Sequence, residues 1–281
     1  MKHIAITILL AGFLLTRPLS ANPDSQMELV DLRSGQTIRL ADQGHALAGH
    51  RIILVGEYHT AAGHHQAQLA VIQSLVAAGQ KVAIGMEMFR RDSQPSLDAW
   101  VGGQLKASAF EAVYRDNWNY PWPLYQPILE YARQNRLALV GLNVPRGITR
   151  QVAREGFSSL STQERQDLPF VTCDVDQDYM AYIRQAYGAH GHGQMNFDHF
   201  CEAQLVWDKA MAANALRFLE DHPSHVIVVL AGSGHARKGG IPSQLKKMSS
   251  IKHLVILPEV PGAIDQEILD HDDADFLIRG F

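Results

Sequence analysis

The stretch Ile52-Ile-Leu-Val-Gly-Glu-Tyr-His59 determines the fold, because it joins a buried strand directly to charged side chains. Its first four residues are apolar and mostly β-branched, which is typical of a strand buried on both faces. A glycine then ends the apolar run, and Glu57 and His59 follow it. The stretch therefore predicts a core strand that places a carboxylate and an imidazole at its carboxyl end.

The same design recurs at three later points in the chain. Apolar runs at residues 81–87, 137–143 and 226–235 end in a glutamate, an asparagine and the sequence Gly-Ser-Gly-His. If these strands lie parallel, their carboxyl ends meet at one edge of the sheet, where open α/β folds bind ligands. The polar side chains expected at that edge are Glu57, His59, Glu87, Asn143 and His235.

The remaining periodicity predicts an α/β fold in which helices flank a mostly parallel central sheet. Helices are expected at residues 60–78, 94–105, 146–156 and 200–220, and further strands at 253–257 and 276–279. The turn residues within segment 27–40 predict a small N-terminal hairpin. We expect one domain over residues 27–281, with a helical insertion at about residues 158–204.

Composition narrows the class of function. The formal net charge of −4 gives no basic surplus, so nucleic-acid binding is not indicated. The chain holds 14 histidines, several of them in clusters. Clustered imidazoles favour metal, haem or proton chemistry over scattered surface histidines.

Residues 1–21 have the pattern of a secretory signal peptide: a short positive start, an apolar core of about a dozen residues and a small-residue cleavage site. An uncleaved membrane anchor is the alternative. No cysteine stands near the cleavage site, so a bacterial lipid anchor is not expected there. We therefore expect the protein in the periplasm or secreted.

The two cysteines, Cys173 and Cys201, have two possible states. They flank a single segment and could form one disulfide in an oxidising compartment. Two buried free thiols are the alternative. Their spacing does not match a zinc knuckle.

Several groups near the predicted sheet edge could meet an anionic ligand. His64 and His65 begin the helix after the first strand, and a helix N-terminus favours anions; the alternative is that they decorate an exposed turn. Arg146 and Arg150, one turn apart near the third strand, could hold a carboxylate.

The aromatic residues concentrate in segment 110–131. We expect Pro121, Pro123 and Pro127 to break its first part into a loop, before a helix over residues 124–133. Aromatic residues among prolines could line a pocket for a flat ligand, or could form a packed lid over the sheet edge. The second arrangement is favoured.

Six motifs occur in the order found in a known family. They are Gly56-Glu-Tyr-His59 with His64-His65, Gly85-Met-Glu-Met-Phe89, Trp122-Pro-Leu-Tyr125-Gln-Pro127, Asn143-Val-Pro-Arg146, Glu202-Ala-Gln-Leu-Val-Trp-Asp208 and Gly232-Ser-Gly-His235. Over about residues 45–260 the chain resembles the ChaN-type iron-regulated haem-binding proteins. That family belongs to a wider group with the Tiki metalloproteases and the erythromycin esterases.

The resemblance implies a periplasmic protein of haem and iron uptake, with an outer-membrane haem receptor system as a candidate partner. Family members are similar in holding two stacked haems between two subunits, each iron bound by one tyrosine. The resemblance implies Tyr125, in the Trp-Pro-x-x-Tyr-x-Pro motif, as the iron ligand. The other cofactor-binding residues it implies are His59, His64, His65, His235 and Lys238, with Arg237 as an alternative to the lysine.

A second hypothesis is a hydrolase of the Tiki or erythromycin-esterase type. Glu57, His59, Glu87 and His235 could hold a divalent metal, or His59 could act as a general base oriented by a carboxylate. A serine nucleophile is not indicated, because no Gly-x-Ser-x-Gly elbow is present. A third possibility is that the polar edge is only a relic of ancestry.

Overall fold

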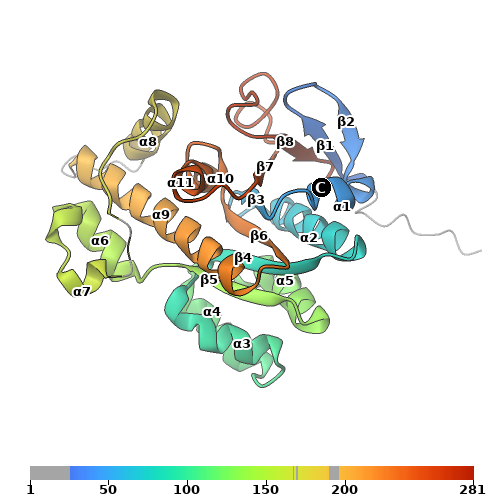
Figure 1. Ribbon diagram of the computed structural model, residues 1–281, viewed down its shortest axis with the longest axis horizontal. Coiled ribbons are helices and arrows are strands. Elements are labelled where there is room, and N and C mark those ends of the chain that lie inside the picture. Colours follow the sequence, from blue (N-terminus) through green and yellow to red (C-terminus); the bar gives the residue numbers. More distant parts are fainter. Residues whose placement is uncertain (1–25, 167, 169, 190–195) are drawn as a thin grey trace, which may run out of the picture.

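The computed structural model describes residues 26–166, 168, 170–189 and 196–281 (Figure 1). An eight-stranded sheet runs through this part in the order β2-β1-β8-β7-β3-β6-β4-β5. The strands from β8 to β5 pair in parallel, whereas β1 pairs antiparallel with both β2 and β8. The predicted fold class, with its mostly parallel sheet and N-terminal hairpin, is confirmed. The predicted signal peptide lies outside the described residues.

The elements alternate along the chain as expected for a parallel sheet. The strands are β1 (Glu28–Asp31), β2 (Thr37–Arg39), β3 (Ile52–Glu57), β4 (Lys81–Arg90), β5 (Ala138–Asn143), β6 (His225–Gly232), β7 (His253–Pro258) and β8 (Phe276–Arg279). The helices are α1 (Gly44–Leu47), α2 (Ala62–Ala77), α3 (Gln94–Val101), α4 (Ala107–Asn117), α5 (Trp122–Asn135), α6 (Arg146–Glu155), α7 (Thr162–Arg165), α8 (Gln177–Ala189), α9 (Phe197–Asp221), α10 (Ser233–Ala236) and α11 (Ile241–Met248).

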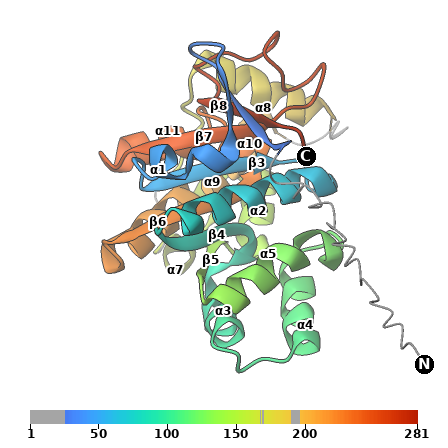
Figure 2. The same ribbon diagram turned by 90° about the vertical axis from the view of Figure 1, so that its right-hand side faces the viewer.

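Helices cover both faces of the sheet, which explains the continuous apolar runs of its central strands (Figure 2). In β3, Ile53 and Val55 join the core that also contains residues of α2, α3, α4 and α5. Ile52 and Leu54 point to the opposite face and join the core with α9 and α11. All four side chains are fully buried. A strand buried on both faces can carry no polar residue until it ends, so its first charges appear at the sheet edge.

Gly56 lets the end of β3 approach its neighbours closely. A Cβ atom at this position would lie 2.7 Å from Leu257 Cδ2 and 2.9 Å from Ser233 Oγ. The glycine that ends the apolar run is therefore required by packing between β3, β7 and α10.

The aromatic segment differs from the prediction, because residues 107–117 form α4 instead of a loop. Phe110 and Tyr114 on α4 are buried, so an apolar face holds this helix on the core. Pro121 and Pro123 stand at the start of α5, where a proline displaces no helical hydrogen bond. Pro127 is accommodated inside α5.

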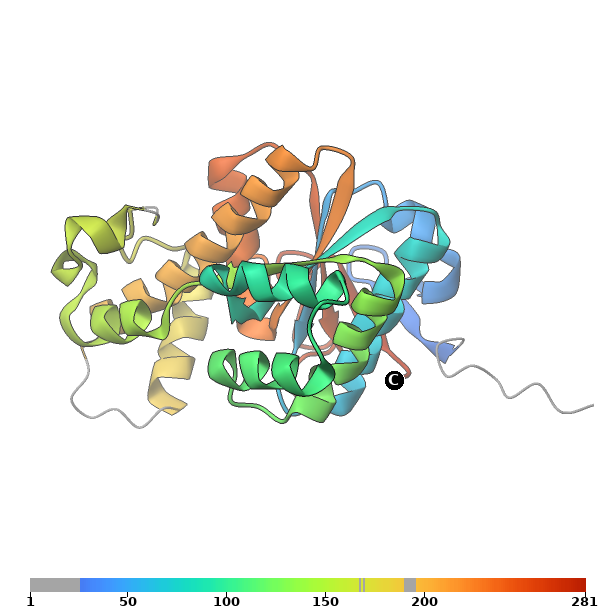
Figure 3. The ribbon, with the colours of Figure 1, turned by 90° about the horizontal axis from the view of Figure 1, so that it is seen from below.

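The insertion lies beside α9 at the opposite end of the molecule from the hairpin (Figure 3). Its described residues include α7 and α8 and contain no strand. Cys173 and Cys201 form a disulfide, which decides between the two states left open by the sequence. The bond fastens the loop before α8 to the first turns of α9. No helix among the described residues is long and apolar enough to cross a membrane.

Replacing Gly56 with alanine should destabilise the fold by about 1–3 kcal/mol, because overpacking forces the neighbouring elements apart. Gly147→Ala on α6 is the matched control, since a Cβ there meets no atom within 4 Å. The control should be neutral or slightly stabilising, because alanine favours helix more than glycine does. Urea unfolding of the two variants measures both effects, and equal stabilities would contradict the packing argument.

Candidate functional site

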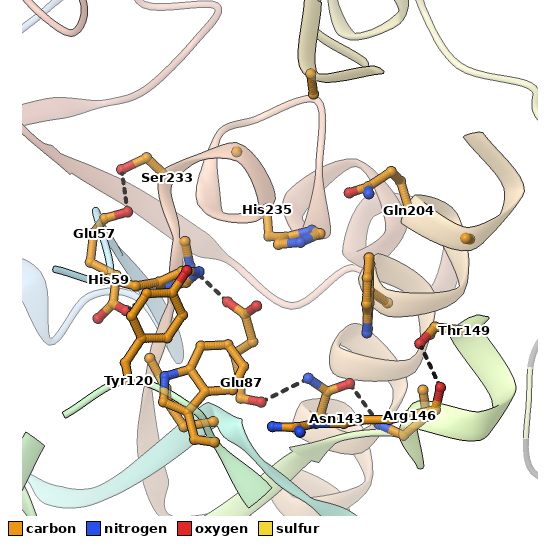
Figure 4. A pocket seen from close by; sticks show the side chains of 18 of the residues that line it. Glu57, His59, Glu87, Tyr120, Asn143, Arg146, Thr149, Gln204, Ser233 and His235 are labelled. Carbon is orange, nitrogen blue, oxygen red and sulfur yellow. Dashed lines mark hydrogen bonds and ion pairs between the residues drawn. The ribbon is translucent and has the colours of Figure 1, made fainter. Parts of the chain in front are cut away.

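A cavity of about 750 Å³ opens at the carboxyl ends of β3, β4, β5 and β6 (Figure 4). Its volume lies within the usual range for small-molecule sites, roughly 300–1,000 Å³. The five polar residues predicted for the sheet edge all line it: Glu57, His59, Glu87, Asn143 and His235. The convergence predicted from the strand ends is therefore observed.

Glu57 is the centre of a buried network. Its side chain has no exposure, yet it accepts a hydrogen bond from the Nδ1 of His59 at 2.7 Å and lies 3.1 Å from the Nδ1 of His65. Tyr125 donates its hydroxyl to the same carboxylate at 2.5 Å. Burial alone would raise the pKa of Glu57, but the hydrogen bonds and charges of the two histidines outweigh it and lower the pKa to about 2. Glu57 is therefore an anion held between imidazoles.

The bond to Glu57 sets the state of His59. An ionised carboxylate only accepts hydrogen bonds, so His59 donates from Nδ1. Burial would lower the pKa of His59, but its hydrogen bond to Glu57 and the charge of Glu87 raise it. The ring packs edge-on to Trp118, with centroids 5.0 Å apart, and also contacts Tyr120.

Glu87 is held by backbone groups and by a neighbouring amide. Its Oε2 accepts the backbone N–H of Gly232 at 2.7 Å, and Asn143 donates to its backbone oxygen at 2.8 Å. A backbone amide can satisfy a buried carboxylate as well as a charged side chain can. The negative charge of Glu87 raises the pKa of both His59 and His235.

His235 forms a second imidazole–carboxylate pair on another wall of the cavity. Its Nδ1 lies 2.7 Å from Oδ1 of Asp208, a fully buried residue of α9. Burial would lower the pKa of His235, but Asp208 raises it to about 9. No role was predicted for Asp208, although a charge within an apolar helix face signals a buried partner.

Four of the residues implied by the resemblance lie away from the cavity. His64 and His65 are buried in α2; His64 accepts the backbone N–H of Tyr58 through Nδ1, and burial lowers its pKa to about 4. Lys238 pairs with Asp275 at 2.7 Å. Tyr125 is fully buried in the core, where burial and the charge of Glu57 raise the pKa of its phenol.

Tyr125 is therefore not placed to bind an iron atom in the cavity. Its hydroxyl is held by Glu57, and a high pKa disfavours the phenolate that would ligate iron. The motif implied Tyr125 as the ligand, but α5 turns this side chain into the core. The tyrosines that line the cavity are Tyr58, Tyr120 and Tyr182.

The remaining lining of the cavity includes both aromatic and cationic side chains. The aromatic residues include Trp118, Tyr120 and Trp207, so part of the aromatic segment lines a pocket while its other part packs in the core. Arg146 and Arg150 lie along the first turns of α6 and also line the cavity. Both are exposed, and Arg146 donates to the backbone oxygen of Asn117 at 2.6 Å.

The arrangement of carboxylates does not make a metal site. Among the described residues, no group of three or more His, Cys, Asp or Glu side chains could hold a metal ion. Glu57 and Asp208 are instead each occupied by imidazole and tyrosine donors. Chemically, the cavity offers two imidazoles paired with carboxylates, several aromatic side chains and a pair of guanidinium groups.

Comparisons with known proteins agree with this architecture. Residues 44–245 match the model of the family described as haem-binding uptake, Tiki superfamily, ChaN. The structure of ChaN of Campylobacter jejuni with cofacially bound haem is similar with a TM-score of 0.69 and 20% identity, over 90% of this chain and 96% of that chain. The type III effector HopBA1 is similar with a TM-score of 0.52 and 13% identity, over 85% of this chain and 91% of that chain.

A curated plant protein is a more distant relative. Protein RETICULATA-RELATED 5, chloroplastic, of Arabidopsis thaliana is 20% identical over 235 residues, which cover 75% of this chain. The match spans only 31% of the plant protein. At these identities the two structural neighbours establish a shared fold.

Glu57→Gln should destabilise the protein by roughly 3 kcal/mol near neutral pH, because the buried imidazoles lose their counter-charge. The folded-state pKa of Glu57 is about 2 against an ordinary 4.5, so its stabilisation is present above pH 4.5 and is lost as the pH falls towards 2. The variant should therefore show a shallower loss of stability between pH 4.5 and 2. Urea unfolding across this range measures the slope.

The control is Glu220→Gln, which neutralises an exposed carboxylate near the end of α9. It should change stability by less than about 0.5 kcal/mol. If Glu57→Gln and Glu220→Gln behave alike, Glu57 is not an ion held by His59 and His65.

Proposed function

Because the chain belongs to the ChaN family of haem-binding uptake proteins in the Tiki superfamily, we propose that the cavity at its sheet edge binds haem. The observation that carries the proposal is that aromatic side chains and cationic groups line one cavity. Haem is a flat apolar ring with two carboxylates at one edge. Trp118, Tyr120 and Trp207 suit the ring, while Arg146 and Arg150 suit the propionates.

We assign the iron ligand to Tyr58 in place of Tyr125. Tyr58 follows Glu57 at the end of β3, lines the cavity and is 42% exposed. Its backbone is held by His64, and its ring contacts the His64 ring with centroids 5.5 Å apart. Tyrosine ligates haem iron in other proteins, and an anionic phenolate oxygen suits ferric iron.

The wider role follows from the family and from the predicted signal peptide. In this proposed role the protein acts in the periplasm in haem or iron uptake. It receives haem from an outer-membrane receptor system. Because Tyr58 is exposed, a haem held there would be accessible to a partner molecule. A homodimer with two haems between its subunits, as the resemblance to the family implies, would supply that partner; the similar Campylobacter protein binds haem cofacially.

Titration of the purified protein with ferric haem should give a tyrosinate-type absorption spectrum and convert monomer to dimer in sedimentation. Tyr58→Phe should remove this spectrum and weaken binding by roughly tenfold or more, since even outer-sphere partners change metal affinity by about 10- to 100-fold. Tyr125→Phe is the matched comparison and should keep the spectrum. If instead Tyr125→Phe removes the spectrum and Tyr58→Phe keeps it, Tyr125 is the iron ligand.

A second candidate function is acid–base hydrolysis without a metal. The observation that favours it is the presence of two imidazole–carboxylate pairs, Glu57–His59 and Asp208–His235, in one cavity. One imidazole in its neutral form could activate water while the other donates a proton to the leaving group.

Turnover of simple aryl esters and peptides tests this candidate. If the cavity is catalytic, His59→Ala should lower kcat/KM by about 10²- to 10⁴-fold, whereas Tyr58→Phe should leave it unchanged. Turnover that survives His59→Ala, or none above buffer in the wild type, eliminates the hydrolase.

A further inference from the structure

His235 is held at the cavity by an unusually complete set of contacts. It belongs to α10, the short helix after β6, and its ring faces the cavity (Figure 4). The Nδ1 of His235 lies 2.7 Å from Oδ1 of Asp208. Because Asp208 as an anion can only accept, His235 donates from Nδ1. The nitrogen left for a ligand is therefore Nε2.

The carboxylate behind His235 is itself fixed from the other side. Tyr179 of α8 donates its hydroxyl to Oδ2 of Asp208 at 2.6 Å. Asp208 has no exposure and Tyr179 has 3%, so no water competes for these oxygens. With one partner on each oxygen, the carboxylate cannot rotate away from the imidazole. The chain Tyr179–Asp208–His235 therefore fixes both the tautomer and the direction of the ring.

Several elements packed near His235 contribute titratable or charged groups. Asp208 on α9 and Glu87 on β4 are anionic and raise its pKa. His59 after β3 is the opposing imidazole, and the charge of His235 opposes the rise in the pKa of His59. On α8, Tyr182 stacks on Tyr179 and lies under the guanidinium of Arg237. The two carboxylates dominate, and they hold His235 in its charged form at neutral pH.

We propose that Asp208 and Tyr179 are positioning residues that present His235 Nε2–H to a carboxylate of the bound ligand. The inference rests on the proposed function, in which the carboxylate is a haem propionate. It makes the helical insertion part of the site, because Tyr179 comes from α8. The disulfide between Cys173 and Cys201 fastens the segment before α8 to α9, the helix that carries Asp208.

The alternative is that Tyr179 and Asp208 only join α8, α9 and α10 together. Both roles predict some loss of stability on substitution, so stability cannot distinguish them. A ligand without carboxylates can distinguish the two roles. Ferric haem dimethyl ester has the same ring and iron as ferric haem, but both propionates are blocked.

Affinities for ferric haem and for its dimethyl ester should be measured at pH 7.5 on the wild type, Asp208→Asn, Tyr179→Phe and Asp221→Asn. Asp208→Asn should weaken haem binding by roughly tenfold or more, as expected for a lost charge-assisted hydrogen bond, and should leave the ester unchanged. Tyr179→Phe should have a smaller effect of the same kind. Asp221→Asn, an exposed carboxylate at the end of the same helix, is the control and should bind both ligands normally.

An NMR titration of the His235 ring in the ligand-free protein tests positioning without haem. The wild-type pKa should lie at about 9, and Asp208→Asn should move it towards the ordinary 6.5. An unchanged titration, or an equal loss of affinity for haem and its ester, overturns the inference. If Asp208→Asn does not fold, Tyr179→Phe supplies the same comparison.

The two proposals can fail separately. If the wild type binds neither haem nor its ester, the proposed function and the carboxylate role of His235 are both wrong. The NMR titration still shows whether Asp208 positions the ring. A wild type that binds both ligands equally, with the variants unchanged, leaves haem binding intact and refutes the role of His235.

Discussion

The site depends on the burial of one charge, the carboxylate of Glu57. A lone carboxylate in the core would cost several kcal/mol, so it must be matched by donors. His59, His65 and Tyr125 supply them from a loop, α2 and α5. This single requirement fixes three elements around the end of β3. It also explains why Tyr125 is a structural residue of the site and cannot also be its iron ligand.

The same physical solution appears a second time in the cavity wall. Asp208 takes the place of Glu57, with His235 and Tyr179 as its donors. Each network ends in an imidazole that lines the cavity, and Glu87 adds negative charge to both. The cavity thus combines two preorganised imidazole donors with aromatic and guanidinium side chains. That combination suits a flat, apolar ligand that carries carboxylates.

Much of this could be predicted from the sequence because the signals were local. Glu57, His59, Glu87 and His235 each lie at or near the carboxyl end of a strand, and parallel topology then brings strand ends together. The placement of Tyr125 and Lys238 could not be predicted, because a motif gives the position of a side chain along the chain and not the direction in which it points. The partner of Glu87 was a backbone amide, which leaves no trace in a sequence. Asp208 did carry a signal, since it is a charge among apolar residues of a buried helix face.

The central claim is that haem occupies the cavity at the ends of β3 to β6. The most direct measurement is a crystal structure of the protein grown with ferric haem, with the iron located by its anomalous scattering. We predict the iron beside the Tyr58 hydroxyl, the ring against Trp118 and Tyr120, and the propionates turned towards α6 and His235. An iron position outside this cavity, or no bound haem at saturating concentration, would contradict the account.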